Sequence, residues 1–172
     1  MDAGRKSEPG PVKNRTTAER KSDRELVVTR IIQAPPRIVF EAWTKAELFQ
    51  RWWVPKAFAP SLLSCEMDVR VGGTYRLVFR SEGSETMAFH GRYLDVVPQA
   101  RLVWTNEEAG NGGAVTTVTF QDQGGKTLLV LSDLYPSKEA LEAGAGSMDG
   151  IHETFQQLDD LLATLGASVE RS

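Results

Sequence analysis

The sequence predicts an α+β fold in which a curved antiparallel sheet wraps around one long C-terminal helix. In residues 148–165 the apolar side chains recur at spacings of three and four, which places them on one face of a helix: Met148, Ile151, Phe155, Leu158, Leu162 and Leu165. Most of the chain before this stretch has the alternation or the β-branched content of short strands. A sheet is therefore the partner that can bury the apolar face of the helix.

The other face of this helix is polar, and we expect its side chains to lie in solvent: Asp149, Glu153, Gln157, Asp160 and Thr164. A sheet that curves around a single helix is difficult to fill with side chains everywhere. A pocket between the sheet and the C-terminal helix is therefore part of the prediction.

The composition is that of an ordinary soluble domain. Of the 172 residues, 41% are hydrophobic and 25% are charged. The net charge of -3 gives no reason to expect nucleic acid or an anionic membrane as a partner. No apolar run approaches the ~18–20 residues of a membrane span. Cys65 is the single cysteine, and the start of the chain lacks an apolar signal core, so we expect a cytoplasmic protein without disulfides.

Residues 1–23 are expected to form a disordered tail, and residues 24–168 a single domain. The tail contains no aromatic residue, and Met1 and Val12 are its sizeable hydrophobic residues. It cannot bury enough surface to offset the entropy of ordering it. A basic arm that contacts nucleic acid is the alternative interpretation, and the solvated tail is the one we favour.

The domain is expected to begin with a strand over residues 25–33, which are rich in β-branched side chains. Two prolines end this strand, and the second of them, Pro36, suits the first turn of a helix. Apolar residues at helical spacing then predict two short helices, over residues 37–45 and 46–53.

Period-two alternation and short turns predict six further strands. Short connections between consecutive strands favour an antiparallel meander. A short helix should follow, with Ser137 as its N-cap, before the long C-terminal helix. The expected order is thus one strand, two helices, six strands and the final helix, about seven strands in all; the six strands cover residues 61–69, 74–80, 86–97, 101–106, 115–121 and 127–134.

Short motifs also occur in a characteristic order over residues 25–166. They include Val39-Phe40-Glu41-Ala42-Trp43-Thr44, Arg51-Trp52-Trp53, Asp68-Val69-Arg70-Val71-Gly72-Gly73, Gly91-Arg92-Tyr93-Leu94-Asp95-Val96-Val97-Pro98, Val118-Thr119-Phe120, and Gly150 with Leu158, Leu161 and Leu162. In this order and spacing the chain resembles bacterial proteins related to the C-terminal domain of the activator of heat-shock protein 90 ATPase. These belong to the START-related, birch-pollen-allergen-like helix-grip superfamily, also called SRPBCC.

The resemblance implies a seven-stranded sheet that grips the C-terminal helix around a hydrophobic cavity, and its name suggests a stress-related role. The superfamily includes lipid and hormone binders, polyketide aromatase/cyclases and co-chaperone domains, so the fold does not settle the function. The chain departs from the family pattern after Gly150, where Ile151-His152 stand in place of a common aromatic residue.

Aromatic side chains from separate segments are the main candidates for a ligand site. The predicted fold would gather them, although a filled core is the alternative explanation for most of them. Tyr93, His152 and Gln156 would orient a ligand through their polar groups, and Arg30 and Glu66 could join them if they point inward. The candidate ligand-binding residues are Trp52, Trp53, Phe79, Phe89, Tyr93, Trp104, Met148, His152, Phe155 and Gln156.

The leading hypothesis is a protein that binds a hydrophobic or aromatic small molecule, as a monomer or homodimer. A cavity of ~300 Å³ or more would favour it. One alternative is a cyclase- or hydrolase-type enzyme with His152 as acid or base. Another is a co-chaperone-like domain with a chaperone partner. No nucleophile–base pair or metal-ligand spacing is visible, so we assign no catalytic residue, metal or cofactor, and we interpret Cys65 as a buried structural thiol.

Overall fold

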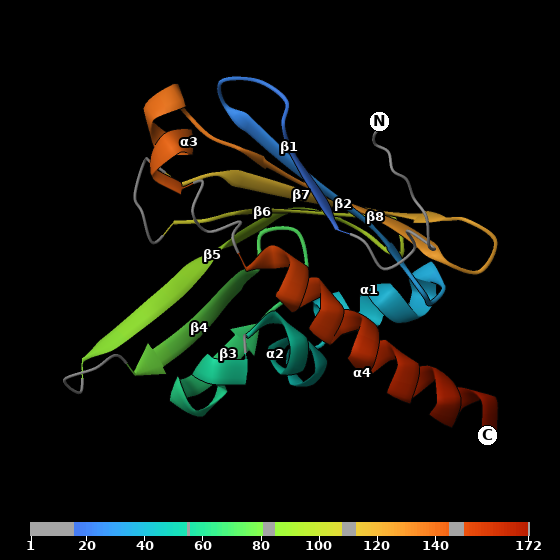
Figure 1. The fold of residues 1–172 in the computed structure, drawn as a ribbon. Coiled ribbons are helices and arrows are strands. Elements are labelled where there is room, and N and C mark those ends of the chain that lie inside the picture. Colours follow the sequence, from blue (N-terminus) through green and yellow to red (C-terminus); the bar gives the residue numbers. More distant parts are fainter. Residues whose placement is uncertain (1–15, 55, 81–84, 108–112, 145–149, 172) are drawn as a thin grey trace.

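In the computed structural model, an eight-stranded antiparallel sheet curves around a long C-terminal helix (Figure 1). The structure describes residues 16–54, 56–80, 85–107, 113–144 and 150–171. The elements in chain order are β1 (Thr17–Arg20), β2 (Glu25–Ile32), α1 (Pro36–Thr44), α2 (Ala46–Trp53), the 3-10 helix η1 (Lys56–Ser61), β3 (Leu62–Met67), β4 (Thr74–Arg80), β5 (Thr86–Val97), β6 (Arg101–Thr105), β7 (Val115–Asp122), β8 (Thr127–Leu134), α3 (Lys138–Gly144) and α4 (Ile151–Arg171).

The strand order across the sheet is β1-β2-β8-β7-β6-β5-β4-β3. Strands β3 to β8 form the expected meander, and β2 closes it by pairing with β8. The predicted α+β helix-grip architecture is therefore confirmed, with eight strands rather than seven.

The additional strand is β1, and it corrects one expectation. Thr17–Arg20 lie within the segment expected to be a disordered tail, but they pair with β2 in the register Thr17↔Thr29 to Arg20↔Leu26. All four side chains of β1 are exposed. Backbone hydrogen bonds to the edge of β2 hold this strand, and hydrophobic patterning does not reveal such pairing. Residues 1–15 of the expected tail lie outside the described residues.

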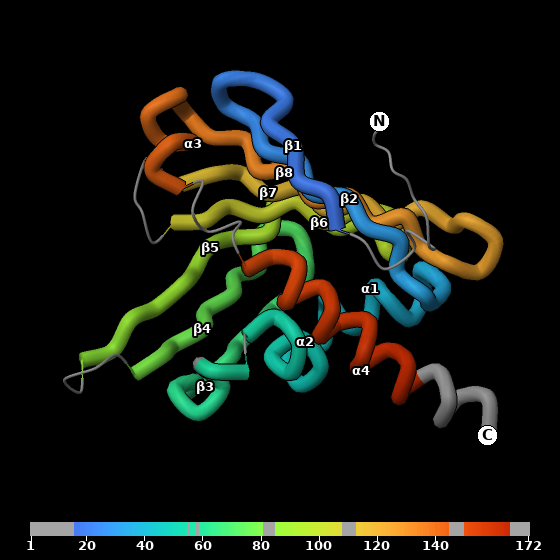
Figure 2. The backbone as a smooth tube through the Cα atoms, viewed as in Figure 1, coloured from blue at the N-terminus to red at the C-terminus, as the bar shows by residue number. Residues whose placement is uncertain are grey.

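Helix α4 lies across the concave face of the sheet, with α1 and α2 beside it (Figures 1 and 2). Phe155 and Leu158 are fully buried and Leu162 is almost so, as the apolar stripe predicted. Gln157 was expected in solvent, yet it is buried. Its side chain accepts a hydrogen bond from the backbone N–H of Lys56 and donates to two carbonyl oxygens at the end of α2.

Strand β5 makes the bend that creates space inside the sheet. Its first half pairs with β4 and its second half with β6, and the change of partner falls between Arg92 and Tyr93. Gly91 lies at this bend, where a Cβ atom would come within 2.0 Å of the carbonyl oxygen of Thr105. A side chain cannot be accommodated there, so glycine permits the close approach of the two strands.

Candidate functional site

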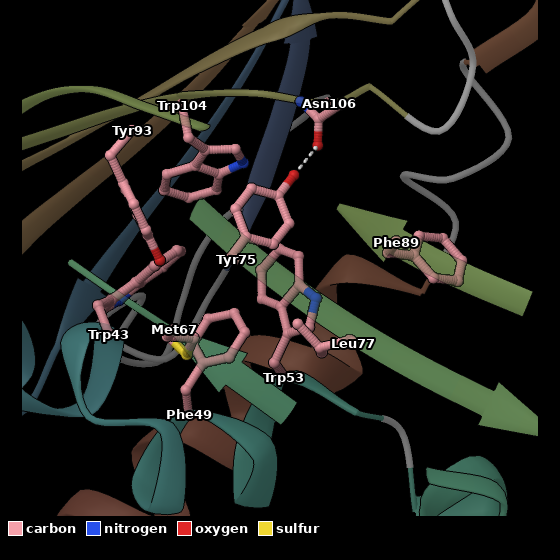
Figure 3. Close-up of a pocket in the computed structure, with 10 residues that line it drawn as sticks. All are labelled: Trp43, Phe49, Trp53, Met67, Tyr75, Leu77, Phe89, Tyr93, Trp104 and Asn106. Carbon is pink, nitrogen blue, oxygen red and sulfur yellow. Dashed lines mark hydrogen bonds between the residues drawn. The ribbon is translucent and has the colours of Figure 1, made fainter. Parts of the chain in front are cut away.

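A pocket of about 70 Å³ opens where α1 and α2 face strands β3 to β6 (Figure 3). The two helices contribute aromatic side chains at helical spacing, and the strands contribute residues on their concave face. Its lining residues are Trp43, Phe49, Trp53, Met67, Tyr75, Leu77, Phe89, Tyr93, Trp104 and Asn106.

The walls of the pocket are aromatic rings in contact with one another. The ring centroid of Trp43 lies 5.7 Å from that of Trp53 and 5.8 Å from that of Trp104. Phe49 stacks on Trp53 at 5.1 Å, with an interplanar angle of 22°. Tyr93 meets Trp104 edge to face at 6.5 Å. Such offset and edge contacts fix the ring orientations, so the walls are held in place before any ligand arrives.

Strand register explains why the β-strand residues reach the pocket together. Tyr75 and Leu77 are two residues apart on β4 and so point to the same face. They lie opposite Gly91 and Phe89 of β5. Beyond the bend, Tyr93 is paired with Trp104 of β6.

Two polar side chains at the pocket are already engaged in hydrogen bonds. The Tyr75 hydroxyl donates to the carbonyl oxygen of Thr105 at 2.7 Å. The Asn106 amide nitrogen donates to the carbonyl oxygen of Ala114 at 2.8 Å and to the hydroxyl of Thr116 at 2.9 Å. These bonds tie the pocket to the loop after β6 and to β7.

Two further polar groups at the pocket lack a partner among the described residues. Tyr93 has 4% of its surface exposed, and no hydrogen bond of its hydroxyl occurs within the described part of the chain. Burial raises the pKa of this phenol, and the nearby Cys65 and Asp68 raise it further, so Tyr93 keeps its proton. The indole N–H of Trp43 is buried and likewise has no acceptor among the described residues.

The described residues that line the pocket carry no formal charge at neutral pH, because none of them is Asp, Glu, Lys, Arg or His. Nearby, burial raises the pKa of the Cys65 thiol to about 11, which leaves it protonated and unreactive. Within the described ranges, no group of three or more His, Cys, Asp or Glu side chains could hold a metal ion. The helices described there also include none that is long and apolar enough to cross a membrane.

The structure brings some of the sequence-predicted residues to this pocket and places others elsewhere. Trp53, Phe89, Tyr93 and Trp104 line it. Trp52 is fully buried behind the lining, where its indole N–H donates to the carbonyl oxygen of Ala42 at 2.9 Å.

The remaining predicted residues lie outside the lining. Phe155 of α4 is fully buried in the hydrophobic core. Phe79 packs edge to face on Phe89, with ring centroids 5.7 Å apart. Met148 lies outside the described residues. His152 is exposed and Gln156 half-buried on the first turns of α4. Both contact Arg30 rather than the pocket.

Arg30 of β2 is the centre of a separate polar cluster. Its guanidinium is buried and pairs with Asp159 of α4, with an Nη2–Oδ2 distance of 2.7 Å. It also donates to Gln156 at 3.0 Å, and its Nη1 lies 3.4 Å from Nδ1 of His152. The same Nδ1 of His152 also lies 3.2 Å from the hydroxyl of Thr16, next to β1. His152 therefore connects the edge of the sheet to α4.

The position of the pocket differs from the one predicted. We expected it between the sheet and the C-terminal helix, but none of the described residues that line it belongs to α4. The apolar side of α4 is filled, since Phe155 and Leu158 have no exposed surface. The helices α1 and α2 provide the facing wall instead.

Several lining residues were absent from the predicted set. Helical spacing places Trp43 and Phe49 toward the interior, and period-two alternation places Tyr75 and Leu77 on one face of a strand. That periodicity was the available signal, but it did not distinguish a pocket wall from a filled core. Asn106 follows the last residue of β6, and nothing in the local sequence marks it as a pocket residue.

Comparison with known proteins identifies the fold independently. Residues 33–163 match the family model of activator of Hsp90 ATPase homolog 1-like proteins. No curated protein matches the chain. Among solved structures, a protein from Rhodobacter sphaeroides is similar at 24% identity, with a TM-score of 0.78 over 87% of this chain and 99% of that chain.

Two further solved structures are similar. A protein from Nitrosomonas europaea has 24% identity and a TM-score of 0.74, over 86% of this chain and 99% of that one. A protein from Chromobacterium violaceum has 27% identity and a TM-score of 0.63, over 80% of this chain and 96% of that one.

Proposed function

This chain belongs to the family of activator of Hsp90 ATPase homolog 1-like proteins, and from that premise we propose that it binds a hydrophobic or aromatic small molecule in the pocket between α1, α2 and strands β3 to β6. The observation that carries the proposal is a preformed pocket whose described lining residues are uncharged and include aromatic rings from three strands and two helices. Small-molecule sites are mostly apolar, with a few polar groups that fix orientation.

The size of the pocket limits how a ligand would enter. Its volume of about 70 Å³ is below the ~300–1,000 Å³ of sites that enclose a drug-sized molecule. A single ring, or one end of a longer molecule, is therefore the part that would be enclosed. Phe89 would contact the rest, because 40% of its surface is exposed and it stands apart from the other lining rings (Figure 3).

Burial of apolar surface would supply the affinity. Aromatic side chains make large contact areas with few rotatable bonds, so little entropy is lost when a ligand orders them. The ring contacts around Trp43 and Trp53 already hold the walls in the free protein. We assign Trp53, Phe89, Tyr93 and Trp104 as the sequence-predicted residues that contact the ligand.

Two measurements test the proposal. Native mass spectrometry of the protein purified from its own host would report a co-purified apolar molecule. Titration with small aromatic compounds would be followed through tryptophan fluorescence, because three of the four tryptophans line the pocket. If no aromatic compound changes this fluorescence and no ligand co-purifies, the proposal is wrong.

A matched pair of variants locates the binding surface. Phe89 and Met87 are both exposed on β5 and point to the same face, but Phe89 lines the pocket and Met87 does not. We expect Phe89→Ala to weaken binding about fivefold through lost apolar contact. Met87→Ala should leave the affinity unchanged. Equal effects of the two substitutions would place the ligand elsewhere.

A further inference from the structure

We infer that the ligand of this pocket is an uncharged aromatic molecule that offers one hydrogen-bond acceptor, such as a ketone or ether oxygen, to the hydroxyl of Tyr93. This inference rests on the proposed function and narrows it to a chemical class. It follows from which polar groups at the pocket are engaged and which are not.

The engaged groups leave little for a ligand. The Tyr75 hydroxyl gives its proton to the carbonyl oxygen of Thr105, and both protons of the Asn106 amide have protein acceptors. These groups therefore hold the structure together and offer no further donor. A ligand could add only weak second contacts to their oxygen atoms.

Tyr93 is different because its hydroxyl has no hydrogen-bond partner within the described residues, although the residue is buried. Its oxygen is not one of the fully enclosed polar atoms, so a molecule in the pocket can reach it. An acceptor atom that enters the pocket would give this hydroxyl a hydrogen-bond partner inside the site. Its phenol remains protonated at any physiological pH because burial raises its pKa, so it acts as a donor.

Trp43 carries a second donor without a partner in the described part of the chain, although its nitrogen is enclosed by the protein and is not open to the pocket as the Tyr93 hydroxyl is. Its indole N–H is buried and has no acceptor among the described residues, and its ring forms part of the same lining as Tyr93. Both polar groups that the fold leaves without partners here are donors. A ligand that brings an acceptor complements this site, and one that brings a donor does not.

The charges around the pocket disfavour an anionic ligand. The described lining residues include no cationic side chain, so a carboxylate would lose its hydration without an ionic partner among them. The charge of Asp68 also acts at Tyr93, where it raises the pKa of the phenol. A negative ligand at the same hydroxyl would meet the same repulsion.

A cationic ligand is disfavoured for another reason. The ring faces of Trp43, Trp53 and Trp104 could attract a cation, as aromatic cages do. However, no carboxylate occurs among the described lining residues, and a cation would leave the Tyr93 donor without a partner. A neutral molecule with an acceptor needs no charged side chain in the lining and gives the Tyr93 hydroxyl a partner.

Four compounds of similar shape test the class directly. Acetophenone, isopropylbenzene, benzoate and trimethylanilinium share one phenyl ring and differ in the head group. Their affinities would be measured by titrating the indole N–H resonances of the four tryptophans in ¹⁵N-labelled full-length protein. We expect acetophenone to bind about five- to tenfold more tightly than isopropylbenzene, as for one neutral hydrogen bond, and both charged compounds to bind more weakly than either.

Substitution of Tyr93 by Phe tests whether the Tyr93 hydroxyl causes the difference in affinity between acetophenone and isopropylbenzene. Tyr93→Phe should lower the affinity for acetophenone to that for isopropylbenzene and leave the isopropylbenzene affinity unchanged. Tyr135→Phe is the matched control, because Tyr135 is buried in a separate apolar cluster with Ala114 and Leu141. This control should leave all four affinities unchanged.

The outcomes separate the inference from the function on which it rests. If acetophenone and isopropylbenzene bind equally, or if Tyr93→Phe does not reduce the preference, the acceptor class is wrong although the pocket binds apolar molecules. Tighter binding of benzoate or trimethylanilinium also overturns the class. If none of the four shifts an indole resonance, the proposed function fails together with this inference.

Discussion

Arg30 and Asp159 form a buried ion pair although 129 residues separate them in the sequence. Two nitrogen atoms of the guanidinium contact the same carboxylate oxygen, Nε at 2.9 Å and Nη2 at 2.7 Å. The other carboxylate oxygen accepts the backbone N–H of Gln33 at 3.1 Å. The pair therefore joins β2 to the middle of α4 on the concave side of the sheet.

Removing one member of this pair should strongly destabilise the fold. Asp159→Ala leaves the Arg30 charge buried without its partner, which costs about 3–5 kcal/mol in the free energy of unfolding. Urea denaturation at neutral pH measures this. The double variant Arg30→Leu with Asp159→Leu should lose much less than the sum of the two single changes. A loss below about 1 kcal/mol for Asp159→Ala would contradict the buried pair.

Gln157 should behave as a structural residue despite its place on the expected polar face. Gln157→Leu keeps the size of the side chain but leaves one backbone N–H and two carbonyl oxygens near the end of α2 without partners. We expect a loss of about 2–3 kcal/mol. Thermal and urea unfolding would measure it, with the exposed Glu153→Ala as the control. A neutral effect of Gln157→Leu would mean that water replaces these bonds.

Leu158→Ala tests the apolar side of α4. Leu158 has no exposed surface, so the truncated side chain leaves a cavity. The expected loss is about 2–5 kcal/mol in the free energy of unfolding. Circular dichroism should show unchanged helix content in the folded variant. If the variant instead unfolds at the same urea concentration as the parent, α4 is not packed as described.

Cys65 should resist alkylation in the folded protein. Its pKa is raised from 9.0 to about 11, which lowers the thiolate fraction at pH 8 by roughly 100-fold relative to an unfolded chain. Iodoacetamide labelling followed by mass spectrometry measures the rate, with urea-unfolded protein as the control. Cys65 is half-buried rather than buried as expected, and rapid labelling of the native protein at pH 8 would contradict its raised pKa.

The same pKa shift predicts the pH dependence of stability. The folded state favours the protonated thiol, so its contribution is fully present below pH 9.0 and is lost as the pH rises through about 11. In Cys65→Ala, the alkaline loss of stability should be smaller. A larger alkaline loss in this variant than in the parent would overturn the assignment.

The sequence predicted the elements that depend on local patterns. Helix α2 and strands β4, β5 and β8 have the predicted bounds. The apolar stripe through Phe155 and Leu162 is buried as its spacing required. Such patterns follow from which side chains share one face of a helix or strand, and that is fixed within a few residues of chain.

Long-range relationships had no comparable signal. Strand β1 has four exposed side chains and exists through backbone pairing with β2. Gln157 has the polarity of a solvent-facing residue, yet its side chain forms hydrogen bonds with backbone groups of α2 and η1. The pair of Arg30 and Asp159 likewise depends on which strand faces which turn of α4.

The amino-acid sequence alone thus determined the family, the antiparallel meander and the apolar face of α4, because periodicity and motif order are local properties. Only the tertiary structure decided where the pocket lies. Strand β5 changes partner from β4 to β6 next to Gly91, and beyond this point Tyr93 and Trp104 line the pocket opposite α1 and α2, while α4 fills its own side of the core. Curvature of a sheet sums small rotations over many strands, so no short stretch of sequence encodes the resulting space.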